Sequence, residues 1–114
     1  MKFETFEEII AWQKAETLTI AIYKAFENSK DFGFKDQIQR ASVSIMNNIA
    51  DGFERKSNKE FSYYLFVAKG SCGEVRSMLH IGSKLQKIDM EFYNENVSLC
   101  QEISKMISGL IKTL

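Results

Sequence analysis

The side chains that most often carry chemistry in proteins are few and scattered in this sequence. The only histidine, His80, has no metal-ligating partner at the spacing of an HExxH or ExxH motif. Cys72 and Cys100 stand in apolar surroundings without CxxC spacing, so we expect buried free thiols. Ser71 lies in a Gly-Ser-Cys-Gly run that has neither an adjacent histidine base nor the flanking sequence of a phosphate loop. The residues therefore predict no enzyme active site, no metal site and no cofactor.

Recognition of phosphate groups is the chemistry that the charged residues could support. Arg55, Lys56 and Lys59 form a short basic cluster, and Lys69 adds charge further along. The chain has 15 basic and 15 acidic residues, so nucleic-acid binding would have to come from such a local patch. We expect these four side chains to contact RNA or DNA. The alternative is a patch that is simply solvated.

A second polar set suggests contacts between helices. Asp36 precedes Arg40 by four residues, and Asp51 precedes Arg55 by four, the order that favours ion pairs along a helix surface. If the chain folds back near Arg55, Arg40 and Glu74 fall within about one helical turn of each other, which offers Arg40 a different partner, either within one chain or across subunits. We expect a polar clasp with a structural role, made of Arg40, Asn48, Asp51, Ser71 and Glu74.

Four helices must position these residues, over about 5–28, 34–53, 58–86 and 90–113. The chain contains no proline, the commonest helix breaker. Thr5 with Glu8, and Ser57 with Glu60, have the form of capping boxes that begin the first and third helices. Short connections favour antiparallel neighbours, so we predict an all-α, up-down-up-down four-helix bundle in a single domain over residues 1–114. The inner faces of the first and last helices should hold Ile9, Trp12, Leu18, Ile22, Phe26, Phe92, Leu99, Ile103, Met106 and Leu110.

The third helix carries two stripes of apolar and small residues, although a bundle needs only one buried face per helix. The first stripe suits a bundle core and comprises Phe61, Leu65, Ala68, Cys72, Val75 and Leu79. The second runs along another side and comprises Tyr63, Phe66, Gly70, Gly73, Ser77 and Ile81. We expect the first five of these to form an oligomer interface. The alternative is that both stripes pack inside one wide bundle.

No segment resembles a membrane span or a leader. No apolar run approaches the roughly 20 residues that a bilayer requires, and the first ten residues are acidic and mixed. We expect a cytoplasmic protein without a membrane partner.

The run SIMNNIADGFER resembles the SIPxNIAEGxxR signature of bacterial four-helix-bundle proteins named for 23S rRNA intervening sequences. Further matches are Trp12 in AWQKA, the residues from Gln37 to Ala41, and AKGSCGEV at Ala68 to Val75. Asp51 stands where the signature usually has glutamate. The resemblance implies a closed homopentamer, in a family whose architecture is better defined than its biochemistry. A similar barrel, the accessory variability protein of diversity-generating retroelements, works with nucleic acid and a reverse transcriptase.

Two functional hypotheses follow for a non-enzymatic protein. The first is a homo-oligomeric bundle that binds structured RNA or DNA through its basic turns. The second is an assembly scaffold that recruits a protein partner and has no direct role with nucleic acid. A ligand site inside the bundle has little support, because the chain lacks the repeated Glu-x-x-His pattern of such sites.

Overall fold

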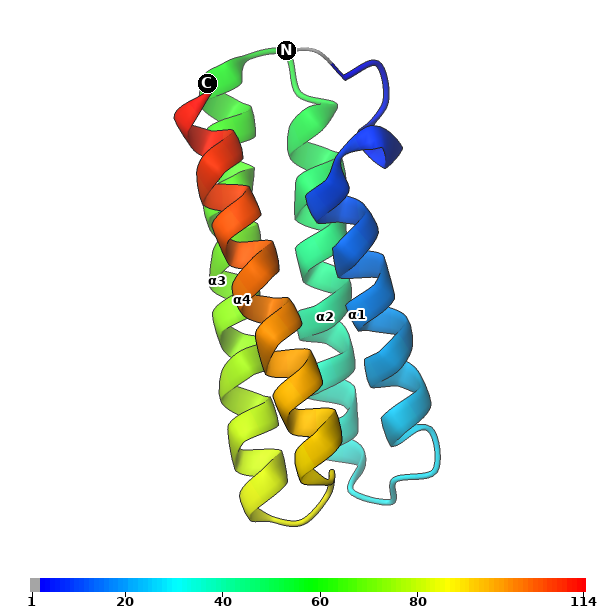
Figure 1. The fold of residues 1–114 in the computed structure, drawn as a ribbon. Helices are drawn as coiled ribbons and strands as arrows, with labels where there is room; N and C mark the ends of the chain where they lie inside the picture. The colour runs from blue at the N-terminus through cyan, green and yellow to red at the C-terminus, as the bar shows by residue number, and fades with distance from the viewer. Residues whose placement is uncertain (1–2) are drawn as a thin grey trace.

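A computed structural model describes residues 3–114, and its elements are all helical. They are the 3₁₀ turn η1 (Phe6–Glu8) and the helices α1 (Ile10–Phe26), α2 (Phe32–Phe53), α3 (Asn58–Lys84) and α4 (Met90–Lys112). Figure 1 shows the four helices side by side, joined by short connections at alternate ends. At about 1.5 Å per residue, the 27 residues of α3 extend along nearly the full 42 Å of the molecule. The predicted all-α class with four helices is confirmed.

Capping side chains set where three of the helices begin. Ser57 accepts a hydrogen bond from the backbone N–H of Glu60 at 3.1 Å, so the predicted start of the third helix is confirmed. At the starts of α2 and α4, the Asp31 and Asp89 carboxylates accept hydrogen bonds from the backbone N–H groups of Phe34 and Phe92 respectively. Each cap satisfies a backbone donor that has no partner inside the helix, which typically stabilises by about 1 kcal/mol.

The predicted start of the first helix is wrong by five residues. The Thr5–Glu8 box forms, with the Thr5 backbone N–H donating to the Glu8 carboxylate at 3.1 Å. It opens only the single turn η1, because Ile9 has an extended backbone with ψ of 117°. Ile9 is 2% exposed, so the break lets its side chain enter the core before α1 begins at Ile10.

Helix α3 ends two residues before its predicted end, through a left-handed residue. Gln86 has φ of 58°, a conformation that stops an α-helix. The backbone N–H of Lys87 donates to the carbonyl oxygen of Gly82 at 2.8 Å, and the backbone N–H of Gln86 donates to the carbonyl oxygen of Ser83. This pair of bonds is a Schellman motif, which usually places glycine where Gln86 stands.

The core lies along the bundle axis. All six residues of the first α3 stripe are buried, as predicted. Leu18, Ile22 and Ile103 are fully enclosed, while Trp12 and Phe92 are only partly buried at its edge. Met78 and Gly82 of α3 are buried as well, whereas no residue of the second stripe is.

An ion pair ties the two connections at the end of the bundle opposite the C-terminus. The Lys87 ammonium lies 2.9 Å from the Asp31 carboxylate and 5.3 Å from the Phe34 ring centroid. The hydrogen bond from Lys87, with a smaller contribution from the Phe34 backbone N–H, holds the pKa of Asp31 below its ordinary value of 3.8. The pair therefore joins the start of α2 to the segment between α3 and α4.

The Asp31–Lys87 pair should make stability depend on pH in acid. A carboxylate with a lowered folded pKa contributes fully above its unfolded pKa, and the contribution is lost as pH falls through the folded pKa. Asp31→Asn keeps an N-cap side chain but removes the charge. We expect the variant to melt below the wild type at about pH 7 and the gap to close at about pH 2. A gap of equal size at both pH values would contradict this account.

Candidate functional site

Helices α2 and α3 approach each other closely at Gly52, inside the signature segment. A Cβ atom built on Gly52 would lie 2.6 Å from Cβ of Tyr64 and 3.3 Å from the backbone oxygen of Phe61. Neither atom is at the flexible end of a side chain, so any larger residue must push α3 away. The glycine of the signature therefore has a packing role.

Hydroxyl and amide groups join the two helices further along. Ser44 Oγ and Ser71 Oγ lie 2.9 Å apart across the α2–α3 contact. The Asn48 side-chain amide donates to the Ser44 carbonyl at 2.8 Å and to the Ser44 hydroxyl at 3.0 Å. Asn48 and Ser71 thus meet through Ser44, a member of this cluster that sequence reasoning did not assign to it.

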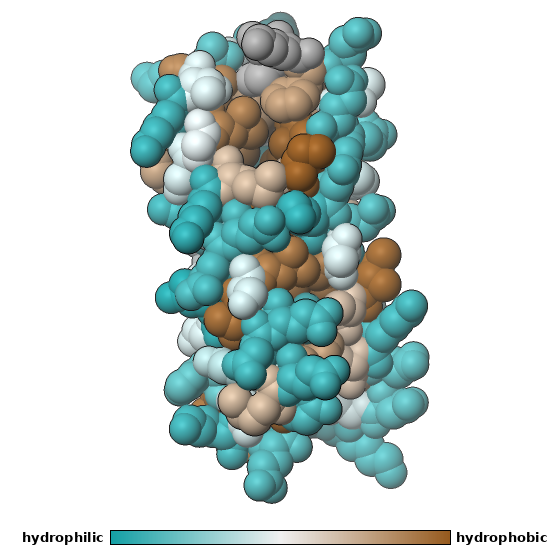
Figure 2. Space-filling model, in the orientation of Figure 1, coloured by the Kyte–Doolittle hydropathy of each residue, from teal (hydrophilic) through white to brown (hydrophobic). Residues whose placement is uncertain are grey.

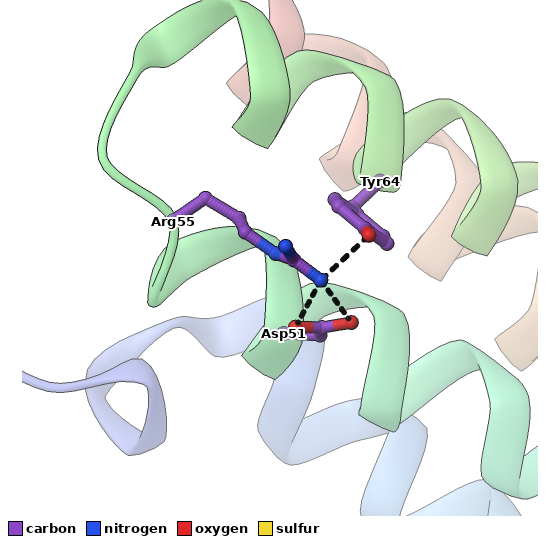
Figure 3. A network of polar contacts seen from close by, with 3 residues as sticks. All are labelled: Asp51, Arg55 and Tyr64. Carbon is purple, nitrogen blue, oxygen red and sulfur yellow. Dashed lines mark hydrogen bonds and ion pairs between the residues drawn. The ribbon is translucent and has the colours of Figure 1, made fainter.

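Arg55 closes the turn between α2 and α3 (Figure 3). Its Nη2 donates to the Tyr64 hydroxyl at 2.7 Å and lies 3.2 Å from an Asp51 carboxylate oxygen. The guanidinium carbon is 4.6 Å from the Tyr64 ring centroid, within cation–π range. The hydrogen bond to Asp51 raises the pKa of Arg55 above its ordinary value. The expected Asp51–Arg55 ion pair is therefore present, and the shorter aspartate reaches the arginine.

The predicted pairing of Arg40 with Glu74 does not occur within the chain. Arg40 Nε bonds to the Asp36 carboxylate at 2.9 Å, on the same exposed side of α2. Glu74 accepts a long bond of 3.4 Å from the Gln37 amide. Within the chain, the five residues of the polar clasp therefore divide among separate local contacts. The prediction that they form one cluster is wrong. The Asp36–Arg40 ion pair, the alternative partner, is the one observed.

The four residues expected to contact nucleic acid differ in whether their side chains are already paired. Lys56, Lys59 and Lys69 are exposed, and none of them forms an ion pair within residues 3–114. Arg55 is already engaged by Asp51 and Tyr64. The turn thus offers two free lysines beside one arginine with a structural role.

The second stripe of α3 lies on the outside of the bundle. We call Tyr63, Phe66, Gly70, Gly73, Ser77 and Ile81 the outer face of α3; all six are exposed. Tyr63 and Phe66 keep 63% and 58% of their surface accessible. A Cβ atom built on Gly70 or Gly73 would meet no other atom within 4 Å. The alternative, in which both stripes pack inside one wide bundle, is therefore wrong.

A separate apolar hollow lies between α1 and α4. Figure 2 shows hydrophobic surface gathered there, among mostly hydrophilic side chains. The hollow has a volume of about 280 Å³, and Ile10, Met106 and Leu110 are among the residues that line it. Among residues 3–114, Thr113 supplies the one polar side chain of its lining, so these residues offer no set of converging polar groups to fix a ligand's orientation.

The two cysteines are the thiol groups of the chain, and both lie in the interior of the bundle. Cys72 and Cys100 are free and buried, as predicted. Burial raises the pKa of each thiol to about 12, partly offset at Cys100 by the positive charge of Arg76. Among residues 3–114, no group of three histidine, cysteine or acidic side chains could hold a metal ion. In the same part of the chain, no helix is long and apolar enough to cross a membrane.

Comparisons with known proteins agree on one family. Residues 7–109 match the family model described as 23S rRNA-intervening sequence protein. Among solved structures, the chain is similar to a protein of unknown function from the S23 ribosomal protein family of Bacteroides thetaiotaomicron VPI-5482. The two are 25% identical, with a TM-score of 0.83 over 90% of this chain and 98% of the other. No curated protein matches the chain.

Proposed function

Since the chain belongs to the 23S rRNA-intervening sequence protein family, we propose that it is a non-enzymatic, up-down-up-down bundle that assembles with copies of itself through the outer face of α3. The observation that carries this proposal is the run of exposed aromatic and glycine residues along that face. A second copy of the chain is the occupant, and the homopentamer implied by the sequence resemblance is the expected form.

The composition of the outer face suits close contact with another helix. A glycine inside a helix costs up to about 1 kcal/mol relative to alanine. Among residues 3–114, nothing packs over Gly70 or Gly73 that would offset this cost. A neighbouring helix could approach closely over the missing side chains, while Tyr63 and Phe66 supply the large aromatic contacts that often dominate interface energies.

We further propose that the assembled protein binds structured RNA or DNA through Lys56, Lys59 and Lys69. Their exposure without ion pairs within the described residues supports the proposal. Glu54 and Glu60 lie beside the turn and weaken the potential of one copy. Assembly repeats the lysines on one particle, where contacts with successive phosphates add and release counterions together.

A charge reversal that leaves Arg55 in place tests this binding. We expect Lys56→Glu with Lys59→Glu to weaken binding of labelled structured RNA, measured by fluorescence anisotropy, by about tenfold or more at low salt. The slope of affinity against salt concentration should also become shallower, because fewer counterions are released. Arg55 is kept because its loss would disturb the α2–α3 turn itself.

The matched control reverses the same number of charges elsewhere, with Lys30→Glu and Lys105→Glu. Both positions are exposed and far along the sequence from the turn. Equal loss of affinity in both double variants would mean that net charge alone governs binding. Unchanged affinity in the Lys56 and Lys59 variant would contradict the proposal and favour the alternative, an assembly scaffold that recruits a protein partner.

A further inference from the structure

A groove between α3 and α4 is lined by side chains that can donate hydrogen bonds. It has a volume of about 400 Å³, and its polar lining comprises Arg76, Ser77, His80, Tyr93 and Gln101. The Tyr93 hydroxyl lies 3.5 Å from His80 Nδ1, which is the only polar contact between these five residues. None of the described residues that line the groove carries a carboxylate. Its chemistry therefore suits a negatively charged, hydrogen-bond-accepting group.

Arg76 carries the positive charge of this groove. It forms no ion pair within residues 3–114. Arg55 and Arg40, by contrast, each pair with an aspartate one turn earlier on α2. The guanidinium of Arg76 presents a planar set of donors that matches a carboxylate.

Glu74 carries an equally uncompensated negative charge on the other edge of α3. Its one hydrogen bond, from the Gln37 amide, is long at 3.4 Å, and no basic group within the described residues lies in ion-pair distance. At about 100° per residue, Glu74 and Arg76 point about 200° apart around the helix. The outer face of α3 lies between them, and its Gly73 and Ser77 also line the groove. The apolar face thus has one acidic and one basic edge.

We propose that the groove receives Glu74 from a second copy of the chain, so that Arg76 of one subunit pairs with Glu74 of its neighbour beside the packed outer faces. This inference rests on the proposed self-assembly and adds the relative direction of the α3 helices in neighbouring subunits. Two α3 helices that run parallel bring unlike edges together, whereas antiparallel helices bring Arg76 against Arg76 and Glu74 against Glu74. The charges therefore select a parallel arrangement and oppose the antiparallel one.

Charge reversal with complementation tests the pair. We expect Arg76→Glu alone and Glu74→Arg alone to raise the concentration needed for half-assembly by roughly tenfold or more, since each places like charges at the interface. The double variant, with both reversals in one chain, should assemble again, because each subunit then still has one acidic and one basic edge and every contact of a closed ring pairs unlike charges. Mass is followed by light scattering across a concentration series.

The controls separate this inference from the proposal on which it rests. Lys105→Glu reverses an exposed charge on α4 outside the groove and should leave the mass unchanged. A wild-type monomer at every concentration would refute self-assembly itself. A wild-type oligomer whose single variants assemble normally, or whose double variant fails to assemble, would overturn only the Arg76–Glu74 pair. Loss of RNA binding by Arg76→Glu with unchanged mass would likewise overturn it and assign the groove to a phosphate.

Discussion

Replacing Gly52 with alanine should destabilise the protein by about 1–3 kcal/mol, the usual cost of overpacking a filled site. The added methyl group would lie 2.6 Å from Cβ of Tyr64 and 3.1 Å from the Phe61 ring. Helix α3 would therefore have to move away from α2 near the turn that joins them. The shift would also strain the bond between Arg55 and Tyr64. Helix propensity works in the opposite direction, since alanine is better than glycine by up to about 1 kcal/mol. Packing outweighs propensity at this position.

Gly109→Ala is the matched control. Gly109 lies within α4, and a Cβ atom there would meet nothing within 4 Å. Only propensity acts at this position, so the control should gain up to about 1 kcal/mol. Urea unfolding at one fixed protein concentration measures both variants, because assembly makes apparent stability depend on concentration. If both alanines stabilised equally, the close α2–α3 approach would be refuted.

Replacing Gly73 with leucine should separate the subunits without unfolding them. Within one chain the site is open, so leucine gains helix propensity and meets no neighbour. In the assembly, the side chain would occupy the space of the adjoining helix, at a cost of about 1–3 kcal/mol per contact. That cost corresponds to roughly 5- to 150-fold weaker association. Sedimentation velocity should show lighter particles than the wild type gives at the same concentration.

Gly109→Leu provides the comparison, because it makes the same substitution at another open helical glycine. It should leave the sedimentation unchanged, and circular dichroism should report equal helix content in both variants. A Gly73→Leu protein that sediments like the wild type would show that the outer face of α3 does not form the contact.

Much of the fold was accessible from the sequence because its signals are local. The Ser57–Glu60 pair marks a helix start regardless of tertiary structure, and the six-residue core stripe of α3 follows from helical spacing alone. The break at Ile9 was not accessible, because it depends on the side chain entering a core built by distant residues. The end of α3 was missed for a related reason: Gln86 adopts a conformation that usually indicates glycine.

The contacts between α2 and α3 show that counting residues from the turn does not give the direction in which a side chain points. Counting outward from the turn estimates how high Arg40 and Glu74 lie along the bundle, but not which way each points. On α2 it is Gln37, one turn before Arg40, that faces Glu74. The Asp51–Arg55 pair was predictable because both residues share one helix. Tyr64 was missed as their third partner, since its position depends on the packing of α3 at Gly52.

The mass of the wild-type protein in solution tests the central claim, self-assembly through the outer face of α3, most directly. Size-exclusion chromatography with light scattering, run over a wide range of concentrations, gives that mass independently of shape. The account predicts a discrete species several times heavier than the 13.1 kDa of one chain. A particle of 13.1 kDa at every concentration would contradict it, and would leave the exposed face to a different protein partner.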